Sequence, residues 1–148
     1  GAHHFLSVTK EGNSAIFSTS GNSYCHTILR GGTKKVNYDE KSIDEVSARL
    51  DKASLPQQIV VDCSHANSLK DHKKQMLVVD DLAKQLCGGE NRIKGLMIES
   101  NLVEGNQNIN DKNLVYGKSV TDACIGWEDT EKAIFKLSDA VNKRKLNA

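Results

Sequence analysis

Apolar and polar positions along the chain follow two periods, one typical of buried strands and one typical of helices. Short apolar runs predict strands at His26–Leu29, Ile59–Val61 and Leu96–Ile98. Between these runs, Ser42–Leu50 and Asp71–Cys87 repeat apolar residues at helical spacing, which predicts two helices. Strands that alternate with helices are typical of a parallel sheet, so the pattern predicts an α/β fold built from repeated βα units.

Both ends of the chain predict further elements. Phe5–Thr9 and Ala15–Thr19 have the pattern of strands, and Lys10–Asn13 between them has turn chemistry, so we expect a β-hairpin there. A last helix is expected to begin near Asp129 and to end in Lys143–Lys145. Acids at its start and bases at its end match the helix dipole.

Two local signals bear on the remaining chain. Ser42 and Glu45 have the spacing of a capping box, which places a helix start at Ser42. Leu102–Gly126 shows little helical or strand periodicity. Long loops without secondary structure are usually functional or disordered, so this segment is expected to be one or the other.

One polar or charged residue follows each apolar run. Arg30, His65 and Glu99 stand just past the three predicted strands, 35 positions apart for the first pair and 34 for the second. In parallel α/β folds, ligands bind at the carboxyl ends of the strands. A cation, an imidazole and a carboxylate at one such edge suit an anionic substrate beside a metal ion.

His65, Glu99 and Asp122 are candidate ligands of one divalent metal ion. An imidazole nitrogen and two carboxylates accept manganese, iron, cobalt or zinc. In the alternative interpretation, His65 is a hydrogen-bonded loop residue, Glu99 a solvated acid and Asp122 a helix cap. Spacing alone leaves both interpretations open.

Arg30 precedes two glycines that let the backbone approach a ligand closely, so its guanidinium is a candidate for holding a phosphate or a carboxylate. The alternative is a structural salt bridge, for example to Asp62. Cys63 and His65 form a C-x-H pair that suggests a nucleophile or a zinc site. We instead expect Cys63 to be a small buried residue on the opposite face of its strand.

Composition narrows the classes of function. The chain has 148 residues and a net charge of +1, which gives no bulk field for nucleic acid or an anionic membrane. No apolar run approaches the roughly 18 residues of a membrane span. The length suits one domain but falls short of a whole (β/α)8 barrel. Four cysteines without a C-x-x-C pair favour a reducing, cytoplasmic setting, and the absence of a signal peptide at Gly1 is interpreted as an internal start.

Several long motifs, which cover nearly the whole chain in order, resemble the microbial type I 3-deoxy-D-arabino-heptulosonate 7-phosphate (DAHP) synthases. The matching segments are His3–Lys10, Leu29–Gly32, Asp62–Ser68, Met97–Asn101, Glu104–Gln107 and Ser119–Glu128. Members of this family condense phosphoenolpyruvate with erythrose 4-phosphate and release phosphate, in the first step of the shikimate pathway. The resemblance implies the C-terminal part of a TIM barrel, strands six to eight, in residues 23–148, with an inserted hairpin in residues 1–22.

The resemblance also implies roles for single residues. The family's equivalents of His65, Glu99 and Asp122 bind the divalent metal, and the equivalent of Arg30 binds phosphoenolpyruvate, so His65 and Arg30 are the expected catalytic residues. The family's cysteine metal ligand, near its first strand, has no counterpart here. Most of its phosphate-binding lysines and arginines are likewise absent. The chain is therefore expected to work as part of a longer enzyme that forms a homo-oligomer.

The hairpin suggests regulation. Phe5, Ser7 and Phe17 align with positions that line the family's site for a feedback-inhibiting aromatic amino acid, and serine at position 7 resembles the phenylalanine-regulated forms. Cross-strand packing of Phe5 against Phe17 is a simpler interpretation, and the two are compatible. Two rival functions remain: an inactive fragment or regulatory subunit that binds an aromatic amino acid or a partner chain, and a related octulosonate synthase, which the long match over Asn101–Trp127 disfavours.

Overall fold

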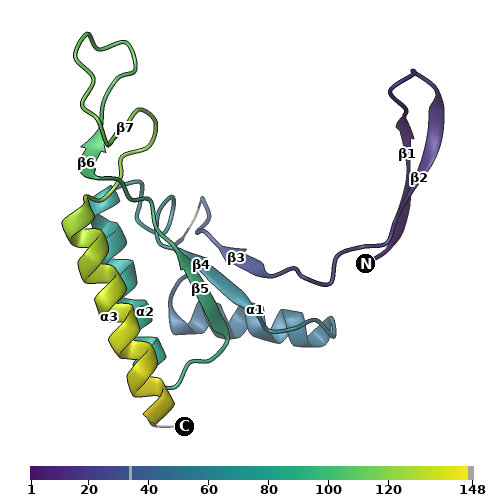
Figure 1. Ribbon diagram of the computed structural model, residues 1–148. Helices are drawn as coiled ribbons and strands as arrows, with labels where there is room; N and C mark the ends of the chain where they lie inside the picture. Colours follow the sequence, from purple (N-terminus) through teal and green to yellow (C-terminus); the bar gives the residue numbers. More distant parts are fainter. Residues whose placement is uncertain (34, 147–148) are drawn as a thin grey trace.

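A three-stranded parallel sheet and three helices form the main body of the chain (Figure 1). The computed structural model describes residues 1–33 and 35–146. The sheet has the order β3 (Thr27–Leu29), β4 (Ile59–Asp62) and β5 (Ile93–Met97). The helices are α1 (Glu40–Lys52), α2 (Gln75–Cys87) and α3 (Trp127–Leu146). The predicted α/β class and the alternation of strands with helices are therefore confirmed.

The hydrophobic core lies between the sheet and the helices. Strand residues such as Leu29 and Val61 belong to one buried cluster with Ile43 of α1, Val79 of α2 and Ala133 of α3. Side chains alternate between the two faces of a strand. Ile28, the position before Leu29 in β3, is 48% exposed, so the opposite face of the sheet is open to solvent along this edge strand.

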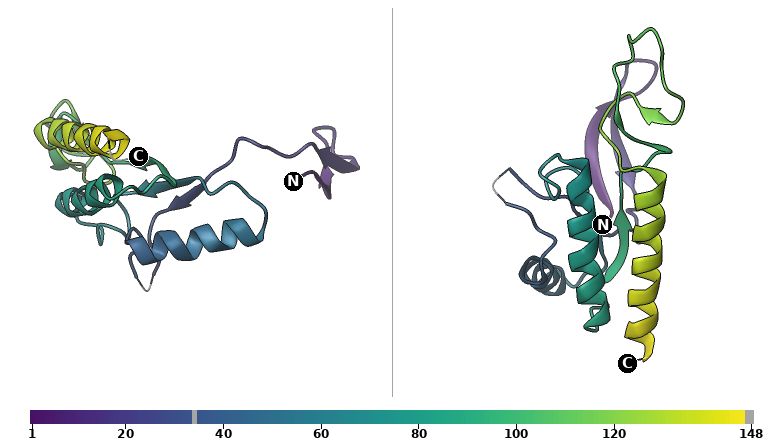
Figure 2. Two further views of the ribbon diagram at one scale, coloured as in Figure 1. Left: turned by 90° about the horizontal axis from the view of Figure 1, so that it is seen from below. Right: turned by 90° about the vertical axis from the view of Figure 1, so that its left-hand side faces the viewer.

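The N-terminal strands form the expected hairpin. β1 (His3–Val8) pairs antiparallel with β2 (Ser14–Thr19), and Phe5 lies opposite Phe17 in the register. The hairpin stands apart from the sheet and its helices, at the end of an extended connection (Figures 1 and 2). Its strands are mostly exposed on both faces, because none of the helices in residues 1–33 and 35–146 packs against them.

The predicted capping box of the first helix is wrong. Helix α1 begins at Glu40, and its cap is Asp39, whose carboxylate accepts hydrogen bonds from the Ser42 amide at 3.0 Å and the Ser42 hydroxyl at 2.8 Å. Ser42 therefore donates within the first turn, where a cap residue would accept. Sequence signals for a helix start are ambiguous here because Asp39 and Ser42 both have capping chemistry.

Other boundaries also shift from their predicted places. The predicted helix Asp71–Cys87 divides into a 3-10 turn, His72–Lys74, and α2 proper. Strand β5 begins at Ile93, three residues before the predicted start. Helix α3 begins at Trp127 instead of near Asp129, and none of the helices within residues 1–33 and 35–146 is both long and apolar enough to cross a membrane.

The segment 102–126 is an ordered excursion from the sheet. It contains β6 (Val103–Asn106) and β7 (Lys118–Ser119), which pair in parallel, so the prediction of a segment without strands is wrong. A bridge between Gly105 and Cys124 and a hydrogen bond from the Asn106 side chain to the Thr121 carbonyl add to this pairing. The strands escaped prediction because they are short and carry almost no apolar alternation.

Candidate metal centre

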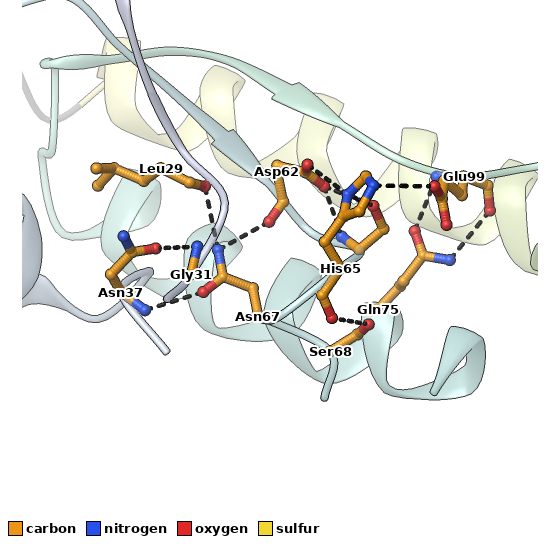
Figure 3. Close-up of polar contacts among 10 residues, drawn as sticks. Leu29, Gly31, Asn37, Asp62, His65, Asn67, Ser68, Gln75 and Glu99 are labelled. Carbon is orange, nitrogen blue, oxygen red and sulfur yellow. Dashed lines mark hydrogen bonds and ion pairs between the residues drawn. The ribbon is translucent and has the colours of Figure 1, made fainter. Parts of the chain in front are cut away.

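The ends of the central strands bring three candidate ligands to one place. His65 follows β4, Glu99 follows β5, and Asp122 comes from the excursion before α3. One ligand atom of each residue lies within 4.8 Å of the other two. The Nε2 atom of His65 and the Oε1 atom of Glu99 are 3.5 Å apart (Figure 3). His65 and Glu99 are half-buried and Asp122 is exposed, so the cluster opens to one side.

A buried carboxylate fixes the ring of His65. Asp62, only 2% exposed, contacts the His65 Nδ1 atom through its Oδ2 oxygen at 2.8 Å. Its Oδ1 oxygen accepts hydrogen bonds from the Ser64 amide at 2.9 Å and the Ser64 hydroxyl at 2.6 Å. Because Nδ1 is engaged in this way, the Nε2 atom is the one that faces Glu99. His65 also adopts a left-handed backbone conformation, with a φ of 50°, which turns it out of the strand direction.

Negative charge gathers around His65. Burial raises the pKa of Glu99 above its ordinary value; the charge of His65 opposes this rise, and the carboxylates of Asp122 and Asp62 add to it. A raised carboxyl pKa reflects a cost of keeping several negative charges together out of water. The site therefore places three carboxylates beside one imidazole, and the charge of Arg30 also lowers the pKa of Glu99.

The loop that carries Arg30 is joined to the loop that carries His65. The Gly31 amide donates to the Asn37 side chain at 2.7 Å, and the Asn37 amide donates to the Asn67 side chain at 2.9 Å. Asn67 in turn donates to the carbonyls at the ends of two neighbouring strands, Leu29 and Asp62 (Figure 3). This buried network holds the two strand ends in a fixed relation.

Gly31 allows that close approach. It has a φ of +76°, and a side chain there would place its Cβ 2.8 Å from the Ala66 Cβ atom and the Asn67 nitrogen. The two loops line a cavity of about 500 Å³, whose walls include Arg30, His65 and Lys70. Within the described residues Arg30 forms no ion pair, so the predicted alternative of a salt bridge to Asp62 is wrong.

Burial disfavours the reactive, deprotonated form of the thiol next to this site. Cys63 is fully buried, and burial, together with the charge of Asp62, raises its pKa to about 12. A thiol with such a pKa stays protonated near neutral pH. The structure thus confirms the prediction that Cys63 is a small buried residue.

Basic residues from the turn before α2 surround the cluster. Lys70 and His72 line a smaller cavity of about 120 Å³ together with the three candidate ligands. His72 Nε2 and Lys73 Nζ contact Glu104 of β6, at 2.9 Å and 3.0 Å. These contacts connect the turn to the excursion that carries Asp122.

The candidate effector residues lie on the hairpin, apart from this cluster. The rings of Phe5 and Phe17 stack with centroids 5.9 Å apart, so the cross-strand packing interpretation is confirmed. Ser7 is half-buried opposite Ala15. This geometry leaves the two rings 44% and 40% exposed.

Several site residues escaped the sequence analysis. Asn37, Asn67 and Gln75 are polar residues whose side chains connect the site to neighbouring backbone. The sequence analysis considered the Asp62 side chain only as a salt-bridge partner for Arg30. Their places in the sequence pattern could have identified two of these residues. Asp62 ends an apolar run, and Gln75 lies on the apolar stripe of its helix, four residues before Val79.

Comparisons with known proteins agree with these features. The chain is 56% identical over 144 residues to the Phe-sensitive phospho-2-dehydro-3-deoxyheptonate aldolase of Escherichia coli, covering 97% of this chain and 41% of that protein. It is 45% identical over 149 residues to the tyrosine-inhibited aldolase of Candida albicans, covering 97% and 40%. A solved phospho-2-dehydro-3-deoxyheptonate aldolase from Francisella tularensis matches with a TM-score of 0.87 and 49% identity, covering 97% of this chain and 42% of that one.

The chain thus spans about two-fifths of the length of these relatives. The model of the DAHP synthetase I family matches residues 2–134, which include every candidate site residue. With that match and these identities, the chain belongs to the DAHP synthetase I family.

Proposed function

We propose that this chain carries the metal-binding part of a DAHP synthase, which condenses phosphoenolpyruvate with erythrose 4-phosphate. The main support is the convergence of His65, Glu99 and Asp122, whose ligand atoms lie within 4.8 Å of one another. Because the chain matches about two-fifths of its relatives' length, we assign the activity to a longer protein that includes it. In that protein the β3-β4-β5 sheet would form strands six to eight of the barrel, and residues 1–22 its inserted hairpin.

The donor set fits a divalent cation. An imidazole nitrogen and two carboxylates are ligands that manganese, iron, cobalt and zinc accept. Burial, with the charges of Asp122 and Asp62, raises the pKa of Glu99, and a cation bound beside Glu99 would stabilise its charged form. When bound, such an ion acts as a Lewis acid that polarises the carbonyl oxygen of the sugar phosphate. A cysteine from the rest of the protein would complete the ligand set.

Arg30 is the proposed binding residue for phosphoenolpyruvate. Its loop is held by the Gly31–Asn37–Asn67 network, and it shares a cavity with His65. A guanidinium forms bidentate hydrogen bonds with a phosphate or a carboxylate, and this pairing fixes the orientation of the bound anion. Lys70, on the wall of the same cavity, adds a second positive charge. Holding both reactants in line supplies part of the rate acceleration.

Feedback inhibition by an aromatic amino acid, phenylalanine in particular, is proposed for the hairpin. Exposed aromatic rings at Phe5 and Phe17 support this, with Ser7 as a polar neighbour on the same strand as Phe5. Stacking on aromatic faces is a common means of recognising an aromatic ligand. The regulated species would be a homo-oligomer of full-length chains.

The experiment that tests the proposed reaction is a turnover assay on the intact protein. We expect phosphoenolpyruvate to be consumed only when erythrose 4-phosphate is present. Chelation should abolish turnover, and added Mn²⁺ should restore it. An intact protein that binds phenylalanine but consumes no phosphoenolpyruvate at any metal concentration would instead support the inactive regulatory subunit.

Substitution of Asp62 by asparagine should weaken metal binding sharply. The Ser64 amide requires an acceptor at the Oδ1 position, so the asparagine side chain must place its oxygen there. Its NH₂ group then faces His65 Nδ1, which must become the acceptor, and the ring proton moves to Nε2. That tautomer lacks the lone pair that a metal ion needs. We expect Mn²⁺ affinity to fall roughly 10–100-fold, the range for loss of an outer-shell partner.

The matched control is Asp71→Asn. It makes the same substitution at a carboxylate that contacts the Lys73 amide at 3.1 Å and Lys74 at 3.7 Å, and it leaves the Asp62–His65 contact in place. The two dissociation constants are measured by electron paramagnetic resonance of free Mn²⁺. Equal affinities of Asp62→Asn and the wild type would contradict this role of Asp62.

A further inference from the structure

A buried glutamine of helix α2 is bonded to the main chain of a candidate metal ligand. Gln75, fully buried at the first residue of α2, donates from Nε2 to the Glu99 carbonyl at 3.0 Å. Its Oε1 oxygen accepts a hydrogen bond from the Glu99 amide at 2.8 Å (Figure 3). One primary amide thereby satisfies both backbone groups of one residue, as a neighbouring strand would.

The place of this contact explains why a side chain is needed there. Strand β5 ends at Met97, whose carbonyl still accepts the Cys63 amide at 2.8 Å. Two residues later, no strand of residues 1–33 and 35–146 pairs with Glu99 on the side of α2, and Gln75 takes that position. A buried backbone group without a partner is destabilising, so the glutamine fixes the peptide at the point where the sheet stops.

The same contact reaches the segment that delivers Asp122. The Glu99 carbonyl accepts a second hydrogen bond, from the Ile125 amide at 3.0 Å. The Ile125 carbonyl in turn accepts the Asn101 amide at 3.0 Å. A carbonyl oxygen has two lone pairs, and here one is used by Gln75 and the other by the returning chain. Gln75 and Ile125 together set where the Glu99 backbone lies relative to the end of the excursion.

We propose that Gln75 is a positioning residue of the metal centre, holding the backbone of Glu99 so that its carboxylate meets His65 and Asp122. This inference rests on the proposed metal site. It extends that site to a residue in a different element, whose side chain is not among the candidate ligands. A core glutamine with no such role would stabilise the fold without altering metal affinity.

The test compares Gln75→Met with Gln85→Met in the intact protein. Methionine keeps the length and volume of glutamine and removes both hydrogen bonds. Gln85 is a matched control because it lies on the same helix and also donates to a backbone carbonyl, that of Tyr38, at 2.9 Å. Mn²⁺ dissociation constants, melting temperatures and hydrogen exchange of the Glu99 amide in the metal-free protein are measured for both variants.

We expect Gln75→Met to weaken Mn²⁺ binding roughly 10–100-fold and to speed exchange of the Glu99 amide. Excess Mn²⁺ should restore most of kcat. Gln85→Met should keep wild-type Mn²⁺ affinity and wild-type exchange of the Glu99 amide. Wild-type affinity and wild-type Glu99 exchange in Gln75→Met would overturn the proposal.

The test also includes a substitute variant and a readout that does not depend on metal. If Gln75→Met does not fold, Gln75→Asn takes its place, because it keeps a primary amide but is one methylene too short to bond both the amide and the carbonyl of Glu99. Its Mn²⁺ affinity should also fall, and wild-type affinity would refute the role. If the wild-type protein binds no Mn²⁺, the proposed function fails, whereas exchange of the Glu99 amide in the metal-free variants still decides whether Gln75 holds that residue.

Discussion

Replacement of His65 by alanine in the intact protein is expected to abolish metal-dependent turnover while leaving the fold in place. His65 is half-buried at a loop after β4, so its removal opens no large cavity in the core. It contributes one of the three ligand atoms that lie together. The loss of activity should therefore exceed the roughly 10–100-fold that removal of an outer-shell partner causes.

Turnover at saturating Mn²⁺ and the thermal unfolding midpoint are the two measurements for this variant. His72→Ala is a suitable comparison, because His72 lines the same cavity but contacts Glu104. We expect His72→Ala to keep measurable turnover. His65→Ala protein with near-normal activity after chelation and metal restoration would refute its assignment as a ligand.

The chain of 148 residues by itself is expected to show no synthase activity. It offers three candidate metal ligands and, in Arg30, only one of the expected binding residues for phosphoenolpyruvate. When catalytic groups act as a unit, the loss of some of them removes most of the activity, so a partial site does not give a partial rate. The edges of β3 and β5 are unpaired within the β3-β4-β5 sheet, which favours association between copies.

Phosphoenolpyruvate consumption with added Mn²⁺ tests the first part, and light scattering after size-exclusion chromatography tests the second. The sample must be checked by mass spectrometry for any longer form of the protein. Measurable turnover by this chain would mean that copies of it rebuild a complete site. The intact protein, assayed in parallel, supplies the positive control.

Much of the sheet, and the candidate ligands that follow its strands, were predictable from the sequence. Apolar runs located β3, β4 and the end of β5. Of the polar residues after them, His65 and Glu99 lie 3.5 Å apart, and Arg30 shares a cavity with His65. Boundaries were less predictable, because pairing decides them. Lys94 and Gly95 carry no apolar signal, yet Gly95 pairs with Val60 and extends β5 toward its start.

The supporting residues of the site were beyond prediction for a different reason. Gln75 contacts a residue 24 positions away, and Asn67 contacts a carbonyl 38 positions away. Hydrogen bonds of this kind leave no periodic trace in the sequence. Only a polar residue on an otherwise apolar face, as at Gln75, indicated that a buried partner must exist.

The separation of the hairpin from the sheet has an evolutionary consequence. Phe5 and Phe17 pack on each other and are absent from the buried cluster that joins the sheet to its helices. Substitutions in the hairpin are therefore expected to leave the packing beneath the candidate metal centre unchanged. If the hairpin is the effector site, sensitivity to one aromatic amino acid can drift toward another through single steps that each preserve a working enzyme. In that case feedback control diversifies faster between lineages than the chemistry of the site.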